Sequence, residues 1–140
     1  MKIAVIDGQG GGLGSAIIQK LRENLSSEDE ILALGTNAIA TSQMMKSGAT
    51  RGATGENAFL VNTRRVDVIL GPLGILLANA MLGEITPKMA EAVAASPARK
   101  IVLPITTCNV EVAGQSEQAS LPDLIEQLVR SLVAYKAQRN

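Results

Sequence analysis

The sequence predicts a Rossmann-like three-layer α/β sandwich built on a mainly parallel sheet of four to five strands. Short aliphatic runs alternate with amphipathic stretches along the chain, which is typical of repeated strand–helix units. Five glycines lie between Gly8 and Gly14, directly after the first aliphatic run. The chain has 140 residues and no Pro- or Ser-rich linker, so we expect a single domain over residues 1–140.

The first third of the chain is expected to alternate strand and helix twice. Lys2 to Asp7 is an aliphatic run that ends at glycines, as a buried parallel strand does. Ser15 to Leu25 carries its aliphatic residues on one helical face. Glu30 to Gly35 repeats the strand pattern, and Ala38 to Ser47 is expected to be a helix that ends before a glycine.

The middle third is less regular. Gly48 to Asn57 contains Gly-Ala-Thr twice and is expected to be a flexible loop. Asn57 to Arg65 favours a helix, and Val66 to Leu70 favours a third strand. Ile75 to Leu82 is expected to be a helix that is apolar on nearly every side, so part of it should lie between subunits, with packing in the core alone as the alternative. We therefore expect a homodimer or a larger homo-oligomer.

The last third is expected to hold two helices and two strands. Thr86 to Ala95 begins with a Thr N-cap followed by Pro, and this helix-start chemistry also explains the turn before it. Lys100 to Ile105 is a fourth strand. Asn109 to Ala113 alternates valines with other residues and is expected to be a short edge strand. The final helix starts at Ser120.

Charge and composition exclude several kinds of partner. Lys plus Arg equals Asp plus Glu at 13 each, so no net field attracts a polyanion. Phe59 and Tyr135 are the only aromatic residues, too few to stack bases, so we expect no nucleic acid partner. The apolar stretch from Val68 to Gly83 is interrupted by Gly and Pro, and no signal peptide is evident. We expect a cytoplasmic protein with no membrane partner.

Few side chains in this sequence suit catalysis or metal binding. There is no histidine, which removes the commonest general base and metal ligand, and we expect no metal site. Cys108 is alone and lacks an activating base, so a buried, unreactive thiol is favoured over a nucleophile. Asp7 is expected to order the glycine loop, with a ribose hydroxyl or a metal as the alternative ligand. Arg51 is read as a solvated surface residue, with clamping of a phosphate as the alternative.

The glycine loop is the strongest functional signal. Glycine lets the main chain approach a ligand closely, and a helix that follows offers unpaired N–H groups and a positive dipole end. A strand, a glycine loop and a helix in this order favour binding of an anion, so we expect the loop to cradle the phosphate of NAD(P) or another nucleotide. The loop residues expected to contact this ligand are Asp7, Gly8, Gln9, Gly10, Gly11, Gly12, Leu13 and Gly14.

Other turns should lie at the same edge of the sheet. In an open parallel sheet the carboxyl ends of the strands share one edge, and ligands bind there at the topological switch point. The turns that follow the second, third and fourth strands therefore join the glycine loop. The residues expected to contact the ligand from these turns are Thr36, Asn37, Gly71, Pro72, Leu73, Gly74, Thr106 and Thr107.

Two resemblances bear on these expectations. Gly8, Gly12 and Gly14 form G-x-x-x-G-x-G, which resembles the cofactor loop of the short-chain dehydrogenase/reductase family and implies NAD(P) binding. Val66 to Ile75 is similar to that family's fourth-strand segment, although only Gly74 matches its Asn-Asn-Ala-Gly. The Tyr-x-x-x-Lys pair of the family is absent, as is the acid that ends its second strand, so hydride transfer by its mechanism is not expected.

The whole chain also resembles a bacterial family of unknown function, which implies no activity. The segments that carry this second resemblance are Ile-Asp-Gly-Gln-Gly-Gly-Gly at 6–12, Leu-Gly-Thr-Asn at 34–37, Gly-Ala-Thr-Gly-Glu-Asn at 52–57, Leu-Gly-Glu-Ile-Thr-Pro-Lys-Met-Ala at 82–90 and Cys-Asn-Val-Glu at 108–111.

Three functions remain open on the sequence. The first is a nucleotide- or dinucleotide-binding module with a sensing or regulatory role. The second is a small enzyme acting on a phosphorylated or nucleotide substrate through Asp7 or the turn from Thr106 to Asn109. The third is a structural oligomeric protein whose glycine loop binds nothing.

Overall fold

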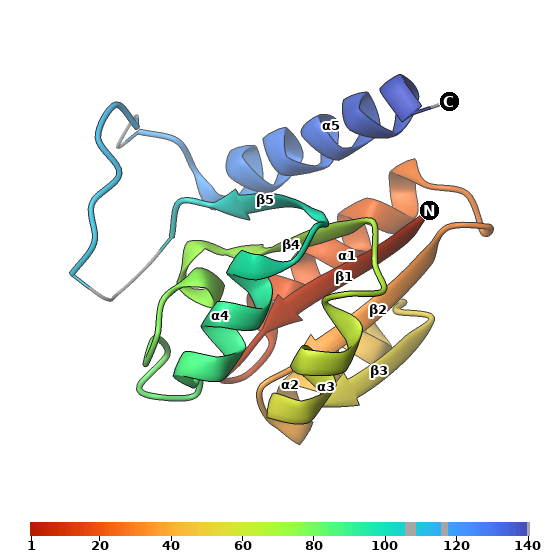
Figure 1. Cartoon of the computed structure of the whole chain (residues 1–140). Coiled ribbons are helices and arrows are strands. Elements are labelled where there is room, and N and C mark those ends of the chain that lie inside the picture. The colour runs from red at the N-terminus through yellow and green to blue at the C-terminus, as the bar shows by residue number, and fades with distance from the viewer. Residues whose placement is uncertain (106–108, 116–117, 140) are drawn as a thin grey trace.

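The structure is a computed structural model that describes residues 1–105, 109–115 and 118–139 (Figure 1). Five strands in the described residues form one parallel sheet in the order β3-β2-β1-β4-β5. The strands are β1 (Lys2–Asp7), β2 (Glu30–Gly35), β3 (Arg51–Thr54), β4 (Val68–Pro72) and β5 (Arg99–Leu103). Helices cover both faces of this sheet, so the predicted Rossmann-like three-layer α/β fold is confirmed.

Each face of the sheet has its own hydrophobic core. Alternate residues of a strand point to opposite faces, and both faces are buried here, which is why the strands are continuously aliphatic. One core joins the sheet to α1 (Gly12–Asn24), α2 (Ala38–Lys46) and α5 (Leu121–Arg139). The other joins it to α3 (Glu56–Asn62), α4 (Pro87–Ala95) and the short 3₁₀ helix η1 (Leu73–Leu76).

The strand order places β1 beside β4 at the centre of the sheet. The chain leaves β1 towards the face covered by α1 and leaves β4 towards the face covered by α4. Such a divergence opens a crevice at the carboxyl ends of the two strands, where ligands of doubly wound folds bind.

Local chemistry fixes several elements where the sequence predicts them. Asn37 caps α2 by accepting the Ala40 N–H at 2.9 Å, and Thr86 caps α4 by accepting the Met89 N–H at 3.1 Å. On α5, the Tyr135 ring lies under two guanidinium groups, at 5.3 Å from Arg99 and 5.8 Å from Arg139. None of the helices in the described residues has the length and apolar character needed to cross a membrane.

One predicted helix start is wrong, and one strand lies where a loop is predicted. α1 begins at Gly12, three residues before the predicted Ser15, because Gly11 in the left-handed region (φ 74°) ends the loop early. The predicted flexible loop from Gly48 to Asn57 contains strand β3, which pairs with β2 from Leu32↔Arg51 to Gly35↔Thr54. The neighbouring strand supplies the hydrogen bonds that the local sequence does not indicate.

The predicted edge strand from Asn109 to Ala113 is absent. These residues form no strand, and Val110 and Val112 are 42% and 41% exposed. Figure 1 shows this segment projecting away from the sheet. The alternation of valines therefore reflects no buried face, and β3 is the strand that completes the set of five.

The predicted helix from Ile75 to Leu82 is also wrong. Only η1 is helical, and turns follow it in which Asn79, Met81 and Leu82 have positive φ values of 67°, 57° and 57°. Leu82 is 97% exposed rather than buried on a helix face. The argument for self-association from an all-round apolar helix is therefore lost, and self-association stays a prediction.

Candidate functional site

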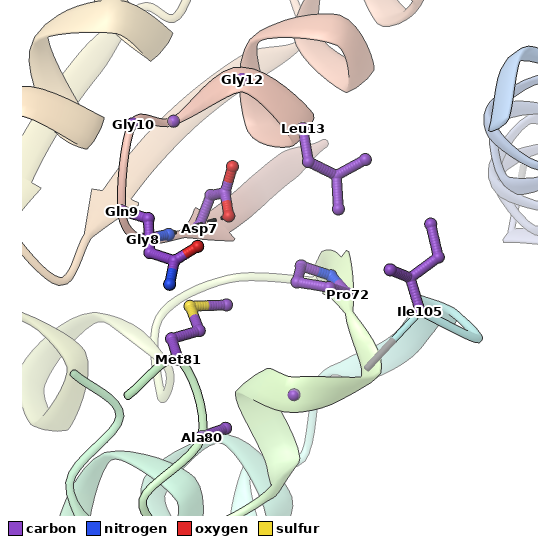
Figure 2. Close-up of a pocket in the computed structure, with 12 residues that line it drawn as sticks. Asp7, Gly8, Gln9, Gly10, Gly12, Leu13, Pro72, Ala80, Met81 and Ile105 are labelled. Carbon is purple, nitrogen blue, oxygen red and sulfur yellow. Dashed lines mark hydrogen bonds between the residues drawn. The ribbon is translucent and has the colours of Figure 1, made fainter. Parts of the chain in front are cut away.

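A pocket of about 210 Å³ lies in the crevice between the glycine loop and the turn after β4. Figure 2 shows the loop facing Pro72 and Met81 across this pocket. The residues that line it are Asp7, Gly8, Gln9, Gly10, Gly11, Gly12, Leu13, Pro72, Gly74, Ala80, Met81 and Ile105. Most of the loop and two residues of the β4 turn therefore meet where the sequence predicts.

Five of the other predicted contact residues do not line the pocket. Gly14 lies behind the loop in α1, and Gly71 and Leu73 do not line the pocket. The turn from Thr106 to Cys108 lies outside the described residues. Arg51 forms an ion pair with Glu30 at the opposite edge of the sheet, which agrees with its reading as a surface residue.

Three glycines of the loop are required by the fold itself. A Cβ on Gly8 would lie 2.7 Å from both Met81 Sδ and Thr36 Oγ1. A Cβ on Gly14 would lie 2.9 Å from the Cβ of Asp7, and Gly11 has the left-handed backbone that favours glycine. Close packing and backbone conformation thus account for these positions.

Gly10 and Gly12 are different. A Cβ at either position would have no heavy atom within 4 Å, and neither residue has a positive φ. Both are exposed and line the pocket, and their N–H groups have no hydrogen-bond partner in the described residues. Packing of the chain does not explain why these two residues lack side chains.

The Asp7 carboxylate orders the glycine loop through hydrogen bonds to its main chain. Its side chain is 6% exposed, and its two oxygens accept the Gly8 N–H at 2.8 Å and the Gly14 N–H at 2.7 Å. Burial raises the pKa of the Asp7 carboxyl above its ordinary value, against the opposing effect of these N–H donors, and the charge of Glu84 raises it further. These hydrogen bonds are the ordering role expected from the sequence.

Glu84 braces the same loop from the outside and is a residue that sequence reasoning missed. Its Oε1 accepts the Gln9 N–H at 2.9 Å, the Thr36 hydroxyl at 2.7 Å and the Asn37 amide at 2.8 Å. Burial alone would raise the pKa of Glu84, but the three donors outweigh it and hold the pKa below its ordinary value. The helix-start interpretation of its turn concealed this role.

Thr36 and Asn37 belong to this brace and do not line the pocket. The Asn37 amide also donates to the Gln9 carbonyl at 3.0 Å, and its side-chain oxygen caps α2. The polar groups that the sequence offers to a ribose are therefore engaged inside the protein. Contact of these two residues with a ligand stays a prediction.

The segment that carries Glu84 is held in a strained conformation. Non-glycine residues with left-handed backbone cost roughly 1–2 kcal/mol each. Asn79 donates its N–H to the Ile85 carbonyl at 2.7 Å, and Ile85 donates to the Ala80 carbonyl at 3.1 Å. These bonds and the Glu84 brace keep Met81 against the glycine loop, where it closes one side of the pocket.

The pocket has no positively charged lining residue among those that the structure describes. Five segments of the sequence contain none of the 13 Lys and Arg residues, and each segment includes the carboxyl end of one strand. The segments without a cation are 3–19, 31–45, 52–63, 66–87 and 101–129. This separation of charge is visible in the sequence once the strand ends are known.

Two solved structures resemble the chain weakly. A dodecameric FMN-dependent UbiX-like decarboxylase from Escherichia coli O157:H7 is 16% identical over 97% of this chain and 95% of that chain, with a TM-score of 0.46. A putative alcohol dehydrogenase from Thermotoga maritima is 14% identical over 94% of this chain and 37% of that chain, with a TM-score of 0.41. At these scores neither likeness carries an argument about function.

Sequence comparison gives a family but no activity. No curated protein matches the chain significantly. A family model described as "Domain of unknown function (DUF3842)" matches residues 2–137. This match agrees with the end-to-end resemblance to a family of unknown function, whereas membership of the short-chain dehydrogenases is not shown.

Proposed function

The chain belongs to the DUF3842 family, and we propose that it is a binding module that holds a phosphate-bearing mononucleotide in the pocket beside the glycine loop. One observation carries this proposal. Gly10 and Gly12 expose bare backbone to the pocket although nothing in the fold requires glycine there. A ligand that approaches the main chain closely gives both positions a reason to lack a side chain.

The two sides of the pocket suit the two parts of a nucleotide. Gly10 and Gly12 line the pocket, and their N–H groups have no hydrogen-bond partner in the described residues. Together with the positive end of the α1 dipole, these groups can hold a phosphate. The remaining wall is largely apolar and offers a surface for a base or sugar ring. The apolar lining residues are Leu13, Pro72, Ala80, Met81 and Ile105.

The size of the site favours a mononucleotide over a dinucleotide. The volume of about 210 Å³ lies below the range of roughly 300–1,000 Å³ that is usual for small-molecule and cofactor sites, and a dinucleotide exceeds it by more than a mononucleotide does. A dinucleotide would also need the turn after β2, where Thr36 and Asn37 are engaged by Glu84. The geometry therefore does not support the NAD(P) cofactor expected from the sequence.

We assign the module to binding rather than to catalysis. Asp7 is the one ionisable side chain among the described residues that line the pocket, and both of its oxygens already accept backbone N–H groups. A carboxylate used in this way holds the loop and is a poor candidate for a general base.

Native mass spectrometry of the freshly purified protein, followed by calorimetry with a panel of mononucleotides, tests the proposal. We expect Gly12→Val to weaken binding by at least about tenfold, because its side chain would occupy the space of the phosphate, with little change in thermal stability. Gln19→Val is the matched control, since Gln19 is exposed on α1 and does not line the pocket. Failure of every mononucleotide to bind, or equal binding by Gly12→Val, would contradict the proposal.

A further inference from the structure

We propose, on the basis of the proposed function, that this site selects a phosphate group with a single negative charge over one with two. The phosphodiester of a 3′,5′-cyclic mononucleotide has one such charge. The monoester of the corresponding 5′-mononucleotide carries about −1.5 to −2 at neutral pH. The inference rests on the charges that surround the pocket.

The described lining of the pocket lacks a cation that could compensate for the charge of a phosphate. Phosphate sites commonly use a Lys or Arg side chain together with backbone N–H groups. Here none of the described lining residues is Lys or Arg, and the sequence has neither between residues 101 and 129, which includes the turn after Ile105. Lys88 lies in the first turn of α4 but does not line the pocket.

Two carboxylates lie at the pocket or next to its lining loop. Asp7 lies in the floor of the pocket, and Glu84 is hydrogen-bonded to Gln9 of the lining loop. Both are held by neutral N–H and O–H donors, so their charge is not cancelled by an ion pair in the described structure. Each added negative charge on the ligand therefore meets repulsion from two carboxylates. The N-terminus of α1 offers only about half a positive elementary charge against them, and no Lys or Arg side chain adds to it among the described lining residues.

The two phosphate groups differ more in charge than in the hydrogen bonds that they can accept. Monoester and diester present similar acceptor oxygens to the N–H groups of Gly10 and Gly12, so both can form the same set of hydrogen bonds. Repulsion from the carboxylates grows with the ligand charge and is stronger for the monoester. The ring closure of a cyclic mononucleotide also folds its phosphate onto the ribose, which suits the small pocket.

Calorimetric titration of the whole protein near neutral pH tests the inference. The ligands are the 3′,5′-cyclic monophosphates and the 5′-monophosphates of adenosine and guanosine, each measured with EDTA and again with Mg²⁺. We expect at least one cyclic nucleotide to bind about tenfold or more tightly than its 5′-monophosphate under both conditions. Equal or tighter binding of the 5′-monophosphate in EDTA would overturn the inference and leave the proposed function intact.

Two further outcomes are also decisive. Tighter binding of the 5′-monophosphate only with Mg²⁺ would overturn the inference, because a metal ion would then supply the missing positive charge. Failure of all four ligands and of every other mononucleotide in the panel would overturn the proposed function itself.

A charge-insertion variant checks the physical cause. Gln9 is exposed and lines the pocket, so Gln9→Lys adds a cation at the rim. We expect Gln9→Lys to improve binding of the 5′-monophosphate more than that of the cyclic nucleotide and to reduce the ratio of their affinities several-fold. Gln19→Lys on the exposed face of α1 is the control and should leave the ratio unchanged. An unchanged ratio in Gln9→Lys would contradict the electrostatic explanation.

Discussion

The amino ends of the strands form one edge of the sheet and the carboxyl ends form the other. Buried or half-buried carboxylates lie at both edges, but their hydrogen-bond partners differ in charge. At the amino edge, Asp29 is 2% exposed and pairs with the N-terminal ammonium of Met1 at 3.2 Å and with Lys136 Nζ at 2.6 Å. At the carboxyl edge, Asp7 and Glu84 accept hydrogen bonds only from neutral N–H and O–H groups among the described residues. Cations neutralise the first edge and add to its stability, whereas neutral dipoles position the charges of the second edge without cancelling them.

The amino edge therefore contributes to stability, whereas the carboxyl edge is the edge suited to binding a ligand. Further side chains join the strand starts at the amino edge, where Arg22 donates to the Gly48 carbonyl at 2.8 Å and Arg139 pairs with Asp67 at 3.4 Å. The carboxyl edge instead keeps N–H groups at Gly10 and Gly12 without partners. A site that must accept a ligand cannot satisfy all of its own donors.

Removing the charge of Asp29 should produce the largest loss of stability. Asp29→Asn keeps the shape of the side chain but leaves two cations facing each other without a counter-charge. We expect the free energy of unfolding in urea to fall by about 3 kcal/mol, as for other broken buried pairs. Glu23→Gln, which breaks the surface pair with Lys20, is the control and should cost less than about 1 kcal/mol. Equal effects of the two changes would remove the distinction between the edges.

The same pair predicts a dependence on pH. Burial alone would raise the pKa of Asp29, but Lys136 and the N-terminal ammonium outweigh it and hold the pKa below its ordinary value. The folded-state pKa is therefore below the unfolded-state value of about 4, so the stabilisation is complete above that pH. It should disappear as the pH falls through the folded-state pKa, and the difference between wild type and Asp29→Asn should shrink with it.

Alanine substitution in the glycine loop should divide the glycines into two groups. Gly14→Ala places a Cβ against Asp7 and should lower the free energy of unfolding by roughly 1–3 kcal/mol. Gly12→Ala meets open space in the first turn of α1 and should be neutral or stabilising by up to about 1 kcal/mol. Chemical denaturation of both variants measures the contrast. A similar loss in both would mean that the fold requires Gly12 and would weaken the proposed phosphate site.

Loss of the Glu84 brace should affect the carboxyl edge alone. Glu84→Ala removes the acceptor of Gln9, Thr36 and Asn37, and we expect a cost of about 1–2 kcal/mol because these groups are partly open to water. Hydrogen exchange should become faster at the Gln9 amide and stay unchanged at Ile31, whose N–H donates to Thr50 near the other edge. Faster exchange at both amides would indicate general destabilisation instead of a local brace.

The smallest expected effect concerns a buried hydroxyl. Ser15 Oγ in the first half of α1 is buried without a hydrogen-bond partner in the described structure. Ser15→Ala removes this unsatisfied group and improves helix propensity, so we expect a gain of about 0.5–1 kcal/mol in the free energy of unfolding. A loss of stability measured by the same denaturation experiment would show that the hydroxyl has a partner, such as a bound water.

Elements that depend on residues close in sequence were predicted, and elements that depend on contacts between distant segments were missed. The strands β1 and β2 and the capped helices α2 and α4 follow from residues that are close in sequence. β3 was missed because its hydrogen bonds come from β2 and because Gly52 is required by packing, since a Cβ there would lie 2.8 Å from Thr41. The helix expected at Ile75 failed because the following backbone turns left-handed at non-glycine residues, which no pattern in the sequence indicates.

The candidate site shows the same limit. The glycine loop follows β1 and Pro72 ends β4, and the fold brings the carboxyl ends of these neighbouring strands together, so both could be predicted to meet at the pocket. Glu84 could not be found in this way because it is 75 residues from Gln9 in the chain and reaches the loop through a strained turn. Which glycines of the loop are required by packing was likewise hidden, since the neighbours of Gly8 and Gly14 come from distant elements.

The position of Tyr135 makes the protein a favourable subject for spectroscopy. It is the sole tyrosine, the chain has no tryptophan, and its ring contacts the guanidinium groups of Arg99 and Arg139 and does not line the pocket. Its fluorescence should therefore report whether α5 is docked on β5, without interference from other residues. Because the protein absorbs so little near-ultraviolet light, a co-purified nucleobase would dominate the absorption spectrum of a fresh preparation.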